Sequence, residues 1–218
     1  MHSVSEENYI KTIYHLQEGS ALVSTNEIAT RMNTKASSVT DMLKKLADKN
    51  LAEYIPYRGA RLTENGWTCA VQIIRKHRLW EVFLVQKLNF AWDEVHDVAE
   101  QLEHIQSRKL INELDKLLGY PKRDPHGDPI PDQHGNFEKT HKTLVSQLNK
   151  GDRGTLVGVM DSSSQFLKYL DKHQIQLGTS IQILDREEFD QSFSIQANDK
   201  TLQISEQIAD NLYLKLQE

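Results

Sequence analysis

Residues 27–51 read EIATRMNTKASSVTDMLKKLADKNL, and this stretch decides the fold of the N-terminal part of the chain. Its first half predicts a short helix with an apolar face of Ile28, Ala29 and Met32, and Thr25 is the expected N-cap. A polar turn at 33–35 follows. A second helix then places apolar side chains at i, i+3, i+4 and i+7, namely Val39, Met42, Leu43 and Leu46. Two short helices joined by such a turn form a helix-turn-helix.

The outward face of the second helix has the chemistry of a surface that reads DNA. Small polar side chains come first and lysines follow. Small hydroxyls let a helix enter the major groove, while lysines contact the flanking phosphates. The expected interface therefore consists of Thr25, Lys35, Ser37, Ser38, Thr40, Asp41, Lys44 and Lys45.

A β-hairpin is expected directly after this helix, in LAEYIPYRGARLTENG (51–66). Leu51–Tyr54 and Arg61–Thr63 alternate as strands. The tip, residues 57–60, would present Tyr57 and Arg58 to the phosphates or the minor groove. Helical units with serine and lysine surfaces also serve as protein-interaction modules, so the pattern alone leaves that alternative open.

The charge balance supports a local DNA footprint. The whole chain carries a formal net charge of −5, yet residues 31–61 hold seven Lys and Arg against three Asp and Glu. A basic segment of this kind is what nucleic-acid binding requires. The only cysteine, Cys69, excludes an internal disulfide and a thiolate-rich zinc site. The chain has no long apolar run and no signal-peptide pattern, so we expect no membrane association and a cytoplasmic location.

Two later stretches combine imidazole and carboxylate side chains at helical spacing. His77 and Glu81 lie at i, i+4 in IIRKHRLWEVFLVQKL (73–88). The stretch EVHDVAEQLEHIQS (94–107) carries one stripe of His96, Glu100, Glu103 and His104. Nitrogen with several oxygens and no thiolate suits Mn²⁺ or Fe²⁺, although zinc, cobalt or nickel would also bind. Solvated helix faces, or hydrogen bonds at a dimer interface, are the alternatives.

Three regions follow from these patterns, in a fold that is mainly α with a β-rich C-terminal domain. Residues 1–72 form the winged helix-turn-helix. Residues 73–142 form a helical metal-binding and dimerisation domain, with two long helices to about 118 and a Pro/Gly-rich connector at 119–136. Residues 143–218 form a small barrel, with strands expected near 155–161, 179–187, 192–198 and 200–205 and a helix at 164–173.

Six stretches, in this order, resemble the diphtheria-toxin-repressor family, including its manganese-responsive branch. They are SEENYIKTIYHLQE, EIATRMNTKASSVTDMLKKLADKNL, YRGARLTENGW, RKHRLWEVFL, EVHDVAEQLEH and GYPKRDPHGDPIP. The tail resembles the SH3-like, FeoA-type third domain of the longer members. The resemblance implies a homodimer that binds a palindromic DNA operator when loaded with Mn²⁺ or Fe²⁺, with Zn²⁺ as a further ion in vitro. It would repress genes for metal uptake.

The resemblance also implies two metal sites. The primary site would use Asn8, Glu100, Glu103 and His104, and would tie the first helix to the dimerisation domain. The ancillary site would use His77, Glu81, His96, Asp124, His126, Asp161 and Gln165. Relatives usually carry an acidic residue or methionine at the Asn8 position, and the manganese branch has an acidic residue in place of Lys11. A protonated lysine cannot be a ligand, which argues against a two-metal cluster.

Two other classes of protein share some of these sequence features. A metal-dependent enzyme could use such a site to activate water, but the chain has no HExxH motif and no phosphate-binding glycine loop. We therefore expect no enzymatic activity. A metal-independent adaptor could bind a peptide through the SH3-like tail.

Overall fold

The computed structural model describes residues 2–139 and 141–217, which fall into two compact units. The first unit comprises the residues up to Trp80 together with Glu100–Leu117 and Pro131–Phe137. The second comprises Glu81–Ala99, Leu118–Ile130 and the residues from Glu138 onward. Helices α4 (Glu64–Leu88) and α5 (Val95–Leu102) contribute residues to both units. Within the described residues, no helix has the length and apolar character needed to cross a membrane.

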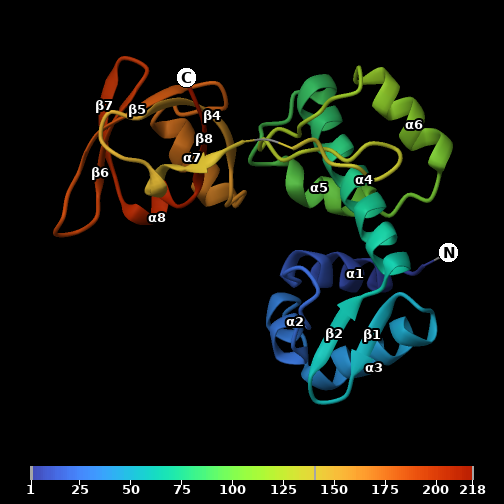
Figure 1. The fold of residues 1–218 in the computed structure, drawn as a ribbon. Coiled ribbons are helices and arrows are strands. Elements are labelled where there is room, and N and C mark those ends of the chain that lie inside the picture. Colours follow the sequence, from blue (N-terminus) through green and yellow to red (C-terminus); the bar gives the residue numbers. More distant parts are fainter. Residues whose placement is uncertain (1, 140, 218) are drawn as a thin grey trace. The chain divides into compact units, whose positions relative to one another are not determined.

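The N-terminal part of the first unit is the winged helix-turn-helix that the sequence predicts. Helices α1 (Val4–Leu16), α2 (Thr25–Arg31) and α3 (Ala36–Asp48) gather beside the antiparallel hairpin of β1 (Ala52–Ile55) and β2 (Gly59–Leu62) (Figure 1). Their apolar faces share one core, in which the side chains of Ile10, Ile13, Ile28, Leu43 and Leu46 are fully buried. Burial of these side chains holds α3 against α1 and α2.

Ser24 caps α2, so the expectation that Thr25 would do so is wrong. The Ser24 hydroxyl accepts a hydrogen bond from the backbone N–H of Glu27 at 3.2 Å, and the Glu27 carboxylate accepts one from the Ser24 N–H at 2.8 Å. This reciprocal capping box needs a Glu or Gln three residues after the cap. Ser24 has one there, whereas Thr25 is followed three residues later by Ile28.

Helices α4, α5 and α6 replace the two long helices expected between 73 and 118. Helix α4 already begins at Glu64, because the Thr63 hydroxyl accepts the backbone N–H of Gly66 at 3.1 Å and starts the helix there. The expected domain boundary at 72/73 therefore lies inside α4. Helix α6 (Arg108–Leu117) begins after Ser107, whose hydroxyl accepts the N–H of Leu110 at 3.3 Å.

Helix α5 ends at Leu102, earlier than the stripe expected at 94–107. A turn follows, in which the N–H of Ile105 donates to the carbonyl of Leu102 at 3.2 Å. Glu103 and His104 therefore do not continue the helical face of His96 and Glu100, as the spacing suggested. They lie in the turn, which directs their side chains independently of the helix.

The part of the connector up to Ile130 belongs to the second unit and lies against the sheet domain there. The N–H of Val159 donates to the carbonyl of His126 at 3.0 Å. Gly127 has a φ of +89°, and a Cβ at this position would lie 2.1 Å from the carbonyl oxygen of Val157. Only glycine allows this close approach of two backbones.

The C-terminal part is a six-stranded antiparallel sheet with the order β3-β8-β4-β5-β6-β7 (Figure 1). The strands are β3 (Thr143–Leu144), β4 (Arg153–Val159), β5 (Ser180–Arg186), β6 (Phe193–Ala197), β7 (Lys200–Ile204) and β8 (Leu212–Leu216). Helix α7 (Ser164–Lys172) confirms the helix expected at 164–173, and the short η1 (Val145–Gln147) and α8 (Glu206–Ala209) complete the region. Strand β8 was not expected, yet it pairs with both β3 and β4. The core of this part includes Leu156, Leu167, Leu170, Ile183, Phe193 and Ile195.

Candidate DNA interface and metal centres

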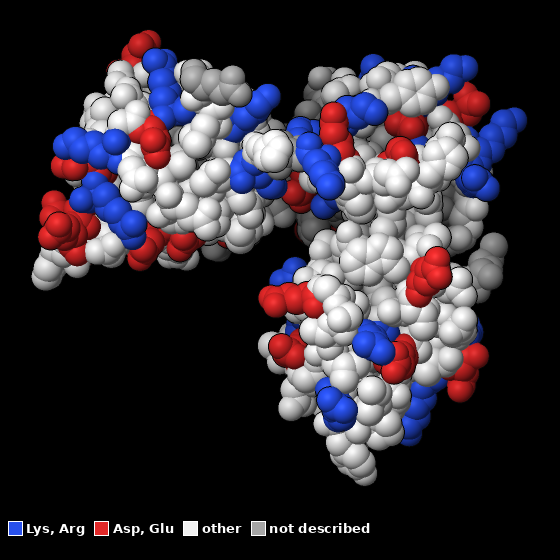
Figure 2. Space-filling view, viewed as in Figure 1, with Lys and Arg blue, Asp and Glu red and all other residues white. Residues whose placement is uncertain are grey.

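The recognition helix α3 presents the polar face that the sequence analysis assigned to DNA. Ser37, Ser38, Asp41 and Lys44 are exposed, and exposed Lys35 directly precedes the helix. Thr40 is half-buried, and its hydroxyl donates to the carbonyl of Ala36 at 3.0 Å, so it is already used inside the helix. Thr25 is half-buried at the start of α2. On the face drawn in Figure 2, basic and acidic side chains alternate over the surface and no single basic field stands out.

The tip of the wing is exposed, as expected. Tyr57 lies between β1 and β2 with a φ of +66° and a fully exposed side chain, and Arg58 beside it is exposed as well. A large aromatic side chain in solvent gains nothing from the fold of its own chain. Its position at the tip of the hairpin is the one that a wing uses to approach a duplex.

Lys45 of the expected DNA face lies in an ion pair with α1. Its ammonium is 2.9 Å from Glu6 Oε1, and the ammonium of Lys49 is 2.7 Å from the same oxygen. Burial would raise the pKa of the Glu6 carboxyl, but the hydrogen bonds from Lys49 and Lys45 outweigh it and lower the pKa to about 2. Glu6 is 1% exposed and thus holds α1 against the end of the recognition helix.

A second buried carboxylate, Glu103, lies at the centre of the expected primary metal site. The Lys11 ammonium of α1 donates to Glu103 Oε1 and Oε2 at 2.9 and 2.7 Å, and to Glu100 Oε1 at 3.4 Å. The Nδ1 of His77 lies 2.6 Å from Glu103 Oε2. Burial would raise the pKa of Glu103, but the hydrogen bond from His77 and the charge of Lys11 lower it. Glu103 therefore carries a negative charge that Lys11 and His77 stabilise.

The fourth expected ligand, His104, is oriented by a carboxylate that the sequence analysis missed. His104 Nδ1 lies 2.6 Å from Glu7 Oε2, and the side-chain amide of Gln106 donates to Glu7 Oε1 at 2.6 Å. The other imidazole nitrogen, Nε2, is 3.8 Å from Glu103 Oε1. Two ligand atoms at that separation can share one ion, and the carboxylate behind the imidazole is the usual second partner of a metal-binding histidine. Asn8 is half-buried on α1.

The second unit contains a converged group of ligand atoms. Glu81, Asp124 and His126 are all buried, and each offers one oxygen or nitrogen within 4.8 Å of the others. Glu81 Oε1 lies 3.7 Å from His126 Nδ1 and 3.6 Å from Nδ1 of half-exposed His96. Buried carboxylates are costly unless a cation compensates them. Oxygen and imidazole ligands without thiolate fit Mn²⁺ or Fe²⁺.

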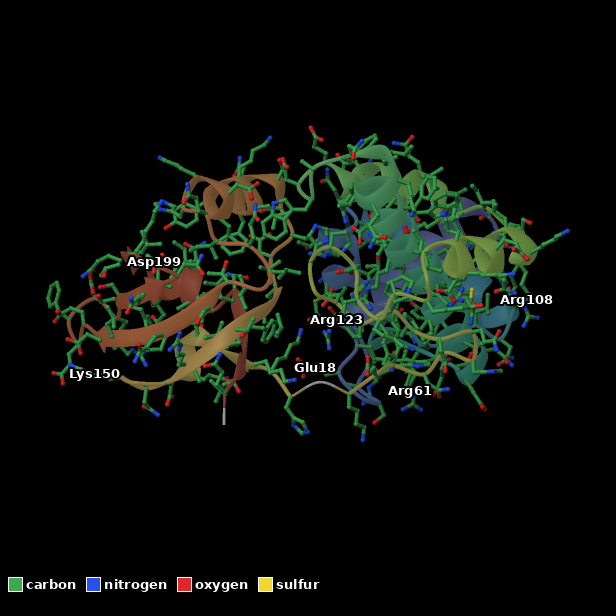
Figure 3. The ribbon with its side chains drawn as sticks, turned by 90° about the horizontal axis from the view of Figure 1, so that it is seen from above. Glu18, Arg61, Arg108, Arg123, Lys150 and Asp199 are labelled. Atoms are coloured by element: carbon green, nitrogen blue, oxygen red, sulfur yellow. The ribbon has the colours of Figure 1, made fainter. Side chains whose placement is uncertain are left out.

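The connector holds two of these ligands in place. Asp124 Oδ1 accepts hydrogen bonds from the backbone N–H groups of His126 and Asp128, each at 2.9 Å. His126 Nε2 lies 2.8 Å from the carbonyl of Trp92; a carbonyl only accepts, so Nε2 carries the proton and Nδ1 faces Glu81. Burial would lower the pKa of His126, but hydrogen bonding to Glu81 raises it. Arg123 closes the loop by donating to the carbonyl of Gly127 at 2.7 Å (Figure 3).

The remaining expected ancillary ligands are His77, Asp161 and Gln165. Among the described residues, Asp161 is not one of the carboxylates grouped with Glu81, Asp124 and His126. Asp161 Oδ1 accepts the N–H of Ser163 at 2.8 Å before α7, and Gln165 is exposed on that helix. His77 is one turn before Glu81 on α4, and its Nδ1 contacts Glu103 as described above.

Glu6, Glu7 and Lys11 carry site contacts that the sequence analysis did not assign. One signal was available for the two carboxylates. Glu6 and Glu7 precede buried Ile10 by four and three residues, which places each of them next to Ile10 on the surface of α1. An acidic residue on an apolar stripe needs a partner, and that requirement could have indicated a buried pair.

Three consecutive parts of the chain match known protein families. Residues 1–60 match the iron-dependent repressor N-terminal DNA-binding domain, and residues 63–132 match the iron-dependent repressor metal-binding and dimerisation domain. Residues 143–216 match the FeoA domain. The order agrees with the winged helix, the helical region and the sheet described above.

Relatives with known sequences and structures agree with these matches. The iron-dependent repressor IdeR of Mycobacterium tuberculosis (strain H37Rv) is 34% identical over 125 residues, which are 57% of this chain and 54% of that protein, so the match spans about half of its length. The diphtheria toxin repressor of Corynebacterium diphtheriae is 26% identical over 96% of each chain. A solved manganese-dependent transcriptional repressor in complex with manganese is 34% identical, with a TM-score of 0.88, over 97% of this chain and all of that one. The manganese regulator SloR is 35% identical, with a TM-score of 0.77, over 97% of this chain and 98% of its own. These relatives are repressors and regulators, not enzymes.

Proposed function

The chain belongs to the diphtheria-toxin-repressor family of metal-dependent transcriptional regulators, and from this premise we propose that it represses genes for metal uptake. It would do so as a homodimer that binds a palindromic operator when loaded with Mn²⁺ or Fe²⁺. The observation that carries the proposal is the buried group of Glu81, Asp124 and His126, in a chain whose N-terminal part is a winged helix-turn-helix. Converging buried carboxylate and imidazole groups are typical of a site for a divalent cation, and a winged helix-turn-helix is typical of a protein that binds duplex DNA.

Helix α3 and the wing supply the DNA contacts in this proposal. The exposed hydroxyls of Ser37 and Ser38 enter the major groove, and Lys44 contacts phosphate beside them. Tyr57 and Arg58 reach the adjacent backbone or minor groove. A symmetric dimer places two such helices in successive major grooves, about 34–36 Å apart, which is why a palindromic operator is expected.

Glu81, Asp124 and His126 are the metal ligands that we propose with the strongest geometric support, and His96 is next to them. A bound divalent ion would be held by the two carboxylates and the imidazole of this group. Asp124 and His126 come from the connector and Glu81 from α4, so a shared ion links the two segments. A second proposed metal site is the primary set of Asn8, Glu100, Glu103 and His104. His77, Asp161 and Gln165 remain predicted ancillary ligands.

Metal-dependent DNA binding requires that the ion favour the DNA-binding conformation over others. A shift from about 1% to about 99% active protein needs a preference of roughly 10⁴-fold, or about 5.5 kcal/mol. Several direct carboxylate and imidazole ligands that assemble only in one conformation can supply such a preference.

The experiment that tests the proposal is a DNA-binding measurement with and without metal. DNA fragments are first selected from a random pool by the full-length protein in Mn²⁺ or in anaerobic Fe²⁺. Their affinity is then measured by fluorescence anisotropy in metal and in chelator. We expect tight binding only with metal, and a selected sequence with two inverted half-sites. Equal affinity in metal and in chelator would contradict the proposal.

A matched pair of variants connects this DNA binding to the buried group. His126→Gln removes a proposed ligand, whereas His134→Gln changes an exposed imidazole elsewhere in the loop region. His126→Gln should weaken Mn²⁺ binding and metal-dependent DNA binding together, and His134→Gln should match the unaltered protein. Equal behaviour of the two variants would remove Glu81, Asp124 and His126 from the proposal.

A further inference from the structure

The Lys11 ammonium lies among the carboxylates of the expected primary site. We propose that its ammonium is a built-in cation, which holds Glu103 and Glu100 to α1 in the metal-free protein and which a divalent ion must displace in order to bind there. This inference rests on the proposed function, because it concerns how the same site takes up metal. It also explains how a site with a lysine in its centre can belong to a metal sensor.

The contacts of Lys11 are those of a cation held by ligands. Three carboxylate oxygens surround its ammonium, two from Glu103 at 2.7 and 2.9 Å and one from Glu100 at 3.4 Å. The Lys11 side chain is 14% exposed and that of Glu103 is 1% exposed. A salt bridge this far from water is weakly screened by salt and is not a casual surface pair.

The remaining ligand geometry is arranged around the same point. His104 presents Nε2 at 3.8 Å from Glu103 Oε1, and Glu7 fixes the imidazole from behind at 2.6 Å. Glu103 Oε1 is also the oxygen that lies 2.9 Å from the ammonium. The Lys11 ammonium and His104 Nε2 thus both lie near the same oxygen, Glu103 Oε1.

A metal ion and the ammonium cannot use these oxygens together. A divalent ion bound to Glu103 would place two further positive charges within a few ångströms of Lys11, in a site largely removed from water. Repulsion between charges is strong at that distance and in that environment. Ion binding therefore requires the flexible lysine side chain to leave, and the cost of its departure lowers the affinity of the site.

Lys11 also makes a mechanical link that the ion would otherwise provide. Lys11 belongs to α1 of the DNA-binding part, and Glu103 follows the end of α5, so their pair joins the two segments without metal. Exchange of the lysine for an ion replaces one link with another. We infer that metal changes the geometry of this junction instead of creating it.

The first test compares charge at position 11. Lys11→Met removes the charged group and keeps most of the length of the side chain, and Lys11→Arg keeps the charge. Lys109→Met alters an exposed lysine of α6 as a control. Mn²⁺ is titrated by calorimetry into each metal-free full-length protein, with no DNA present. We expect Lys11→Met to bind Mn²⁺ at one site at least tenfold more tightly, and to unfold at a lower temperature in chelator. Lys11→Arg and Lys109→Met should show no tightening.

The second test uses the unaltered protein and so does not depend on a variant that folds. Reductive methylation followed by peptide mass spectrometry reports how fast the Lys11 amine reacts. We expect slow reaction in chelator and faster reaction in saturating Mn²⁺, with Lys109 unchanged. A Mn²⁺ affinity that Lys11→Met leaves unchanged or lowers, or a Lys11 amine that Mn²⁺ does not expose, would overturn the inference. Either result is compatible with metal-dependent DNA binding, so the failure of this inference is distinguishable from failure of the proposed function.

Discussion

Glu6 and Lys49 join the first helix of the chain to the end of its recognition helix. The Glu6 carboxylate accepts hydrogen bonds from the Lys49 ammonium at 2.7 and 3.0 Å, and Lys49 is the residue that caps α3. Glu7, the next residue, contacts His104 instead. Two adjacent carboxylates on α1 therefore face the recognition helix and the expected primary metal site, respectively.

Removal of the Glu6 charge should destabilise this junction. Glu6→Gln weakens the two lysine contacts, and we expect the free energy of unfolding to fall by about 1.5–3 kcal/mol because a hydrogen bond to a charged group contributes roughly that much. Urea unfolding of the metal-free protein at pH 7 measures it. Glu18→Gln, at an exposed position (Figure 3), serves as the control and should change little. An equal loss in both variants would show that the Glu6 pair does not stabilise the fold.

The same pair should make stability depend on pH in the acid range. The pKa of Glu6 is lowered from 4.5 to about 2 in the folded chain, so its contribution is complete above about pH 4.5. It is lost as the pH falls from there toward 2, because the unfolded chain takes up the proton first. The difference in unfolding free energy between the unaltered protein and Glu6→Gln should therefore shrink between pH 5 and pH 3. A difference that stays constant over this range would contradict the assignment.

Gly127 offers a test of the connector that carries Asp124 and His126. A Cβ on Gly127 would meet the carbonyl oxygen of Val157 at 2.1 Å, whereas a Cβ on Gly178, which has a similar φ of +92°, would meet nothing within 4 Å. Gly127→Ala should thus lower the free energy of unfolding by about 2–3 kcal/mol more than Gly178→Ala. Both variants strain the backbone, but only Gly127→Ala adds a steric clash. Denaturant unfolding and Mn²⁺ titration measure the two consequences.

The Gly127→Ala variant should also bind Mn²⁺ more weakly, because the loop that positions His126 must move away from β4. Gly178→Ala should keep the affinity of the unaltered protein. If Gly127→Ala loses stability but binds Mn²⁺ as tightly as before, the ion does not depend on this loop.

Neighbouring lysines of α3 should differ in their contribution to DNA binding. Lys44 is exposed, whereas the Lys45 ammonium is neutralised by Glu6 at 2.9 Å. Lys44→Ala should weaken binding to all sequences and reduce the slope of log affinity against log salt by about 0.9, the value for one phosphate contact. Lys45→Ala should reduce that slope by less. Anisotropy titrations over a range of salt concentrations compare the two, and a larger effect of Lys45→Ala would contradict the prediction.

Local patterns in the sequence were sufficient for most elements of the fold and for the family. The spacing of Val39, Leu43 and Leu46 identified the recognition helix, and alternation identified the wing and β4 to β7, because such periodicities depend only on neighbouring residues. Thr25 was the expected cap of α2, and this was wrong, although the box of Ser24 and Glu27 lies within four residues of sequence. The His and Glu residues indicated a divalent metal, because ligand preference depends on the type of side chain.

Only the tertiary structure decided which charges meet. Glu103 is buried against Lys11 from α1 and His77 from α4, and Glu6 is buried against Lys45 and Lys49. No local pattern encodes such pairs, because a buried carboxylate takes its partner from whichever distant segment the fold brings to it. The sequence by itself determined a metal-responsive DNA-binding protein and a set of candidate ligands. The tertiary structure decided that a lysine stands among those ligands, because burial of Glu103 requires a positive charge at that point.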